Sequence, residues 1–282
     1  MGRGLSLVFS KVGLEVTVVG MGNDDLDDFK QRLSDGLDRR IAKYELTKSE
    51  KKALLLNIKA TKLLEEIADS DFILEAITEE LEEKVDLFRK LSKITRPEVI
   101  LASNTSSLSI SELAEQTNKP DKVIGLHFLY PPSKRMVVEI IRGLATSNET
   151  FNIAQTLVKQ VGKEAVEVYE TPGFITTRVI IPFINEAMYT LMEGVASAED
   201  IDKAIKIGYD FSTGPLELAD TIGLDVIMSW MEVLFRELGD LKYRPCPLLR
   251  KYVRARRLGK KTQKGFFDYD DQLRPILSGE SE

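Results

Sequence analysis

A histidine and a glutamate could form an acid–base pair in this 282-residue chain. His127 is its only histidine and lies near the end of a strand predicted over residues 122–129. Glu139 lies in the next predicted strand, over residues 137–141. A carboxylate that holds one ring nitrogen of a histidine fixes the tautomer, so that the other nitrogen can act as a general base. A lone histidine is more often structural than catalytic, and the spacing by itself leaves both interpretations open.

Two polar segments also follow predicted strands. The serine-rich turn 103–107 comes after a strand predicted over residues 99–102, and Glu79 follows a strand predicted over residues 71–78. Ligands of open α/β sheets bind at the carboxyl ends of the strands. We therefore expect these segments and His127 to lie at a ligand site.

The order of the predicted elements indicates an α/β domain followed by a helical one. Strands alternate with helices in the first part, which argues for βαβ units and a mostly parallel sheet. Helical periodicity dominates beyond Pro172, so we place the domains at residues 1–170 and 171–282. The remaining strands are predicted over 15–20 and 165–169, and the helices over 24–44, 79–91, 109–116, 175–193, 197–207 and 216–238, with a capping box at Thr47 and Glu50 that opens one more.

Composition excludes several classes of protein. The formal net charge is −6, from 39 basic and 45 acidic side chains, and a pI near 5.2 argues against a nucleic-acid partner. No apolar run approaches the roughly 18 residues of a membrane helix, so no membrane span is expected. The single cysteine, Cys246, cannot form an intrachain disulfide, which suits a reducing compartment and predicts a cytoplasmic protein. No metal site is expected.

A series of motifs follows along the chain: LEAITEELEEK (74–84), ILASNTSSLSI (100–110), IGLHF (124–128), VVEIIRG (137–143), TPGFI (171–175), INEA (184–187), GVASAEDID (194–202), GPLELADTIGLD (214–225) and LGKKTQKGFFDY (258–269). In this combination and order they resemble the L-3-hydroxyacyl-CoA dehydrogenase family, which includes 3-hydroxybutyryl-CoA dehydrogenases. The resemblance covers essentially the whole chain. It implies an α/β Rossmann-type NAD-binding domain, with a helical insertion over about residues 24–64, followed by an all-α dimerisation domain.

The resemblance also implies an activity and a set of site residues. The family reaction is reversible hydride transfer between NAD and C3 of a (3S)-3-hydroxyacyl-CoA in fatty-acid metabolism. By motif, the catalytic group comprises His127 as general acid/base, Glu139 as its orienting carboxylate, Ser106 as a hydrogen-bond donor to the substrate oxygen, and Thr177. The NAD site would be lined by Gly2, Ala76, Glu79, Lys84, Asn104 and Lys261. The helical insertion would contact the coenzyme A moiety, the C-terminal domain would form a homodimer, and association with an enoyl-CoA hydratase is left open.

Two departures from the family pattern concern the nucleotide site. The family begins with a strand and a G-x-G-x-x-G loop, whereas residues 1–5 match only the last glycine of that loop and the helix after it. We therefore expect an unpaired edge in the middle of the sheet, and a true start upstream of Met1. Gly20 stands where the family places an acidic residue for the adenosine ribose, with Asp24 and Asp25 as substitutes from a shifted loop.

Two further departures concern the substrate. Thr177 replaces a substrate-binding asparagine, and loss of one transition-state hydrogen bond could cost about 10²-fold in rate. Tyr130, Lys134 and Arg135 change the segment after His127, so the preferred acyl group is open. These departures leave two alternatives: an acyl-CoA-binding pseudoenzyme of the same fold, and a dehydrogenase of another hydroxy acid.

Overall fold

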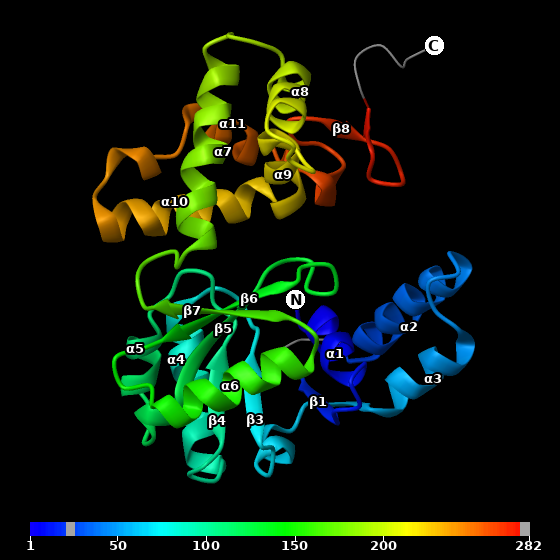
Figure 1. Cartoon of the computed structure of the whole chain (residues 1–282), viewed down its shortest axis with the longest axis vertical. Coiled ribbons are helices and arrows are strands. Elements are labelled where there is room, and N and C mark those ends of the chain that lie inside the picture. Colours follow the sequence, from blue (N-terminus) through cyan, green and yellow to red (C-terminus); the bar gives the residue numbers. More distant parts are fainter. Residues whose placement is uncertain (21–25, 277–282) are drawn as a thin grey trace. The chain divides into compact units, whose positions relative to one another are not determined.

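The chain forms two compact units, Met1–Thr171 and Pro172–Glu282 (Figure 1). The structure is a computed structural model and describes residues 1–20 and 26–276. Each unit has a hydrophobic core of its own. The boundary between them lies one residue from the position expected from the change in periodicity.

The first unit consists of short strands covered by helices. Its helices are α1 (Gly2–Ser10), α2 (Leu26–Ala42), α3 (Lys48–Leu56), α4 (Leu81–Ile94), α5 (Ile110–Glu115) and α6 (Asn148–Gln160), with the 3-10 turns η1 (Leu64–Ile67) and η2 (Pro120–Lys122). Its strands are β1 (Val16–Val19), β2 (Ile58–Thr61), β3 (Phe72–Glu75), β4 (Ile100–Ser103), β5 (Val123–Phe128), β6 (Val137–Arg142) and β7 (Glu164–Tyr169).

The strands of this unit form two separate sheets. β1 and β2 make a parallel pair, and β3-β4-β5-β6-β7 make a five-stranded sheet in that order. Every neighbouring pair of the larger sheet is parallel except β5 and β6, which are antiparallel. β1 and β3 each lie at the end of their sheet, so within the described residues each has one edge without a strand partner. This split agrees with the expected unpaired edge.

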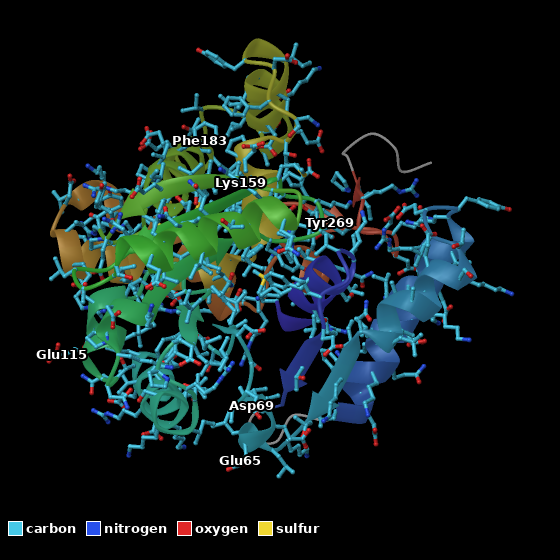
Figure 2. The ribbon with its side chains drawn as sticks, turned by 60° about the horizontal axis from the view of Figure 1, so that its bottom comes forward. Glu65, Asp69, Glu115, Lys159, Phe183 and Tyr269 are labelled. Carbon is cyan, nitrogen blue, oxygen red and sulfur yellow. The ribbon has the colours of Figure 1, made fainter. Side chains whose placement is uncertain are left out.

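The larger sheet carries helices on both faces (Figure 1). One face packs against α1 and α6 through a core that includes Leu5, Leu126 and Phe151. All side chains of β4 and β5 are buried, as continuous apolar runs of central strands require. Outward-facing charged side chains lie at the ends and outer surfaces of the elements, as Figure 2 shows for Glu65, Asp69, Glu115 and Lys159.

The expected helical insertion is a helical hairpin followed by a strand. The capping box that opens α3 is formed as predicted, because the Thr47 hydroxyl accepts a bond from the Glu50 N–H and the Glu50 carboxylate accepts one from the Thr47 N–H. Residues Ile58–Thr61 form β2 instead of helix and pair in register with β1. The helical part therefore ends with α3, and the chain joins the two-stranded sheet with β1 before residue 64.

The second unit is mainly helical. Its helices are α7 (Thr176–Met192), α8 (Ala198–Gly208), α9 (Pro215–Ile222), α10 (Leu224–Leu238) and α11 (Pro247–Arg254), with the turns η3 (Leu241–Tyr243) and η4 (Lys260–Thr262) and the two-stranded antiparallel pair β8 (Asp268–Tyr269) and β9 (Pro275–Ile276). The single helix predicted over 216–238 is two helices, because Gly223 has a φ of +109° that ends α9 and starts α10. The pair β8–β9 is a small exception to the expected all-α domain.

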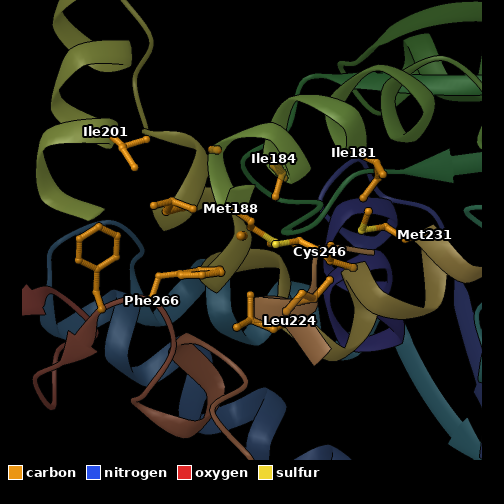
Figure 3. Close-up of a cluster of buried hydrophobic side chains, with 14 of the residues drawn as sticks. Ile181, Ile184, Met188, Ile201, Leu224, Met231, Cys246 and Phe266 are labelled. Atoms are coloured by element: carbon orange, nitrogen blue, oxygen red, sulfur yellow. The ribbon is translucent and has the colours of Figure 1, made fainter. Parts of the chain in front are cut away.

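The core of the second unit gathers side chains from α7 to β8. Figure 3 shows Ile184, Met188, Leu224 and Met231 packed around Cys246. Cys246 is fully buried with a free thiol. Among the helices that the structure describes, none combines the length and apolar character needed to cross a bilayer.

Candidate active site

β5 and β6 place His127 and Glu139 directly opposite each other. The antiparallel register pairs their Cα atoms, so both side chains lie on the same face of the sheet. His127 Nδ1 is 2.6 Å from Glu139 Oε2, and the two side chains are 4% and 1% exposed. The pair considered from spacing alone is therefore formed inside the protein.

The face that carries this pair is set by the alternation along β5. Gly125, two residues before His127, packs so closely that an added Cβ would lie 2.9 Å from Ile141 Cβ and 3.0 Å from Ile110 Cδ1. Ile110 opens α5, so the glycine lets that helix lie against the strand. Because alternate residues share a face, His127 and Glu139 project on the α5 side, opposite the core under α1 and α6.

The pair has the geometry of an oriented acid–base group. When Nδ1 donates its hydrogen to the Glu139 carboxylate, Nε2 carries the lone pair that accepts a proton. The carboxylate also stabilises the imidazolium that forms when Nε2 is protonated. The arrangement can therefore take a proton from a hydroxyl group and return it.

The turn after β4 is arranged around one glutamate. Glu79 Oε1 accepts hydrogen bonds from Thr105 Oγ1 at 2.6 Å, from the Ser106 N–H at 2.7 Å, and from the N–H and Oγ of Ser107 at 3.2 Å each. Ser103 Oγ donates to Glu75 Oε2 at 2.6 Å. Among the described residues, no partner is bonded to the Ser106 hydroxyl, which leaves it available to a ligand.

A buried ion pair lies behind this turn. Lys84 Nζ is 2.6 Å from Glu75 Oε1, with the two side chains 1% and 0% exposed, and it is 3.4 Å from Glu79 Oε2. The lysine expected to line the NAD site thus has its ammonium group between two carboxylates. Sequence reasoning missed Glu75, because a glutamate within an apolar strand has no local pattern that reveals its partner.

Asn104 connects the ends of three strands. Its N–H donates to the Glu75 carbonyl of β3 at 2.9 Å, and its Oδ1 accepts from the Phe128 N–H of β5 at 3.0 Å. The peptide that follows His127 is therefore tied to the polar turn. Ala76 comes directly after β3 and packs against the core of this unit.

The start of α1 fits one part of NAD. An added Cβ at Gly2 would meet no atom within 4 Å, and the first turn contains no acidic side chain and no side-chain cap. Open space beside uncapped N–H groups suits a pyrophosphate. Gly20 follows β1 and offers no carboxylate for a ribose, while Asp24 and Asp25 lie outside the described residues.

Comparison with known proteins identifies the family of this chain. The family model for the 3-hydroxyacyl-CoA dehydrogenase NAD binding domain matches residues 1–171, and the one for the C-terminal domain of that enzyme matches residues 173–269. The chain belongs to the 3-hydroxyacyl-CoA dehydrogenase family. It is accordingly an NAD-dependent oxidoreductase of 3-hydroxyacyl-CoA, with a Rossmann-type domain followed by a helical domain.

Relatives match the dehydrogenase over nearly their full length. A probable 3-hydroxybutyryl-CoA dehydrogenase of Bacillus subtilis is 46% identical over 96% of this chain and 95% of its own. The human mitochondrial hydroxyacyl-coenzyme A dehydrogenase is 35% identical over 95% of this chain and 88% of its own. The crystal structure of the (S)-3-hydroxybutyryl-CoA dehydrogenase from Ralstonia eutropha has a TM-score of 0.88 at 40% identity and covers 96% of both chains.

Two expected site residues of the dehydrogenase lie in its second unit. Thr177 lies in the first turn of α7 and is 2% exposed. Lys261 lies in η4, where its ammonium group is 2.5 and 2.7 Å from the two carboxylate oxygens of Asp225.

The segment after His127 is held by a lysine that sequence reasoning did not identify. Lys163 Nζ donates to the carbonyls of Pro132 at 2.7 Å and Arg135 at 2.6 Å. Burial lowers the pKa of Lys163. Tyr130, expected to alter substrate choice, is 61% exposed in this segment.

Proposed function

We propose that the dehydrogenase oxidises (3S)-3-hydroxyacyl-CoA thioesters, with 3-hydroxybutyryl-CoA as its test substrate. The observation that carries the proposal is the buried pair of His127 and Glu139, 2.6 Å apart, beside a turn with an available hydroxyl at Ser106. The names of relatives at 46% and 40% identity support the four-carbon acyl group.

In the proposed mechanism, His127 removes the proton of the 3-hydroxyl group. Glu139 keeps Nδ1 protonated, so Nε2 receives the proton and the carboxylate stabilises the resulting imidazolium. Ser106 Oγ donates a hydrogen bond to the same substrate oxygen. The role of Thr177 in binding the substrate stays a prediction from the family motif. When bound, NAD would accept the hydride that leaves C3 of the substrate. In the reverse direction, the imidazolium returns its proton to the oxygen.

The proposed NAD site is described by its residues in the first unit. It comprises Gly2 at the start of α1 and residues at or near the strand ends, namely Ala76, Glu79, Lys84 and Asn104. Lys261 of the second unit stays a prediction from the family motif. The ammonium group of Lys84 is buried against Glu75 and lies near Glu79, so Lys84 would act by holding these carboxylates in place. The coenzyme A moiety would contact the α2–α3 hairpin, where a shallow pocket is lined by Lys48, Lys51, Lys52, Leu55 and Leu56. Lysines beside leucines suit a phosphate-bearing, partly apolar group.

The proposed assembly is a homodimer formed by the second unit. Exposed apolar side chains at the start of α7 support it, since Val179 in the helix is 67% exposed and its N-cap residue Ile175 is 44% exposed. Apolar side chains in contiguous patches commonly mark interaction surfaces. Association with an enoyl-CoA hydratase and a cytoplasmic location stay predictions, the second based on the single, buried Cys246.

NADH consumption with acetoacetyl-CoA tests the proposal. His127→Ala should lower kcat by at least about 10²-fold, as loss of a general base does, while Lys159→Ala on the outer face of α6 should match the wild type. Equal turnover by His127→Ala and the wild type would exclude the mechanism. Turnover of a free 3-hydroxy acid in preference to the thioester would exclude 3-hydroxyacyl-CoA as the substrate class.

A further inference from the structure

The hydroxyl groups of the turn after β4 differ in whether they donate a hydrogen bond within the protein. Ser103 Oγ donates to Glu75, and Thr105 Oγ1 and Ser107 Oγ donate to Glu79. Within the part of the chain that the structure describes, Ser106 Oγ makes no such bond. Three hydroxyls thus hold the turn in place, and the fourth remains to bind a ligand.

A single carboxylate oxygen fixes the backbone on both sides of that fourth hydroxyl. Glu79 Oε1 accepts from the Ser106 N–H at 2.7 Å and from the Ser107 N–H at 3.2 Å, and also from Thr105 Oγ1 at 2.6 Å. Charged acceptors make stronger hydrogen bonds than neutral ones. Since the Ser106 N–H is occupied, the hydroxyl is the donor of that residue that remains for a substrate.

The second oxygen of Glu79 is directed at the buried cation. Lys84 Nζ lies 3.4 Å from Glu79 Oε2 and 2.6 Å from Glu75 Oε1. Lys84 is anchored in α4, and Glu75 ends β3. The carboxylate that holds the turn is therefore itself held against two regular elements of the fold.

We propose that Glu79 is the positioning residue for Ser106, setting the place of its hydroxyl by gathering the donors of the turn 103–107 onto one oxygen. The inference rests on the proposed function, in which Ser106 bonds the substrate oxygen. It assigns Glu79 an effect on turnover in addition to its proposed place in the NAD site.

A double-mutant cycle tests the inference with acetoacetyl-CoA and NADH. Ser106→Ala should lower kcat by about 10²-fold, as expected for loss of one transition-state hydrogen bond. Glu79→Ala should lower it by up to about 10²-fold, because a displacement of about 1 Å in a catalytic group has that effect. In the Ser106→Ala background the same Glu79 change should lower kcat by less than about threefold, since the two residues act as a unit.

Conservative and neighbouring variants separate positioning from folding. Glu79→Gln keeps an acceptor oxygen of roughly half the strength and should recover much of the lost kcat. Glu80→Gln changes the adjacent glutamate, which caps α4 without a side-chain bond, and should match the wild type. NADH affinity, measured by fluorescence titration, is followed in the same variants, so that a loss of kcat is separated from a loss of NADH binding.

The outcomes distinguish the inference from the proposed function. If Ser106→Ala turns over as fast as the wild type, the proposed role of Ser106 fails and the inference with it. If Ser106→Ala is slow but the Glu79 effect is fully multiplicative on it, the inference alone is overturned. A change in NADH affinity with kcat unaltered would also overturn it, in favour of a direct NAD contact.

Discussion

Asp220 couples the stability of the second unit to pH. It lies on α9 and is 1% exposed. Its Oδ1 accepts from the Phe266 N–H at 2.9 Å, and its Oδ2 accepts from the Phe267 N–H at 3.0 Å and the Tyr269 hydroxyl at 2.9 Å. Burial raises the pKa of Asp220 from 3.8 to about 6, against the opposing effect of these bonds.

The size and sign of the coupling follow from that shift. The folded unit binds the Asp220 proton more tightly than the unfolded chain, so this contribution to the free energy of unfolding is complete below pH 3.8 and is lost as the pH rises through 6. At about 1.4 kcal/mol per pKa unit, the full change is about 3 kcal/mol. Between pH 4.5 and 7.0, about 2 kcal/mol of it should be observed.

Asp220→Asn removes the titration and provides the comparison. Urea unfolding is followed at pH 4.5 and 7.0 by the fluorescence of Trp230, the only tryptophan, which packs against the core of this unit. The free energy of unfolding of the wild type minus that of the variant should fall by about 2 kcal/mol between the two pH values. Asp210→Asn at an exposed position should show no such trend. A difference that is constant or rises with pH would refute the reasoning.

Two further variants test the first unit. Glu139→Gln keeps the shape of the side chain but loses the charge that stabilises a protonated His127, so kcat should fall by about 10²- to 10⁴-fold with NADH affinity unchanged; a loss below about threefold would contradict the assigned role. Lys84→Met leaves the buried Glu75 carboxylate without its cation and should lower the free energy of unfolding by about 3–5 kcal/mol. Urea titration measures this change, with Lys90→Met as the exposed control. Equal stability of the two variants would contradict a stabilising role for the Lys84–Glu75 pair.

Local patterns predicted most strands of the first unit, whereas the spacing of His127 and Glu139 left their pairing open. β5 and β6 are apolar runs long enough to be recognised, and the spacing of His127 and Glu139 agrees with the antiparallel register that joins them. The capping box at Thr47 was predictable because both of its bonds lie within four residues. These features depend on nearby residues, which a single sequence displays directly.

Features that depend on distant contacts were not predictable in this way. β2 has a half-exposed, four-residue pattern and exists through its pairing with β1. α6 was not predicted, although Ser147 caps it. The sequence predicted Gly223 to lie within one helix, whereas its φ of +109° ends α9. The side chains of Lys261 in η4 and Asp225 in α10 lie beside it. The bonds from Glu79 to the turn span 26 to 28 residues, and no periodicity reports such a contact.

The division of the strands into two sheets has a consequence for how this enzyme behaves at high concentration. The outer edges of β1 and β3 present backbone donors and acceptors without a strand partner in the described residues, and such edges are templates on which strands of other molecules add. Each of these strands is four residues long, so an added strand would form only a short ladder. Self-association through these edges should therefore be weak, reversible and dependent on protein concentration.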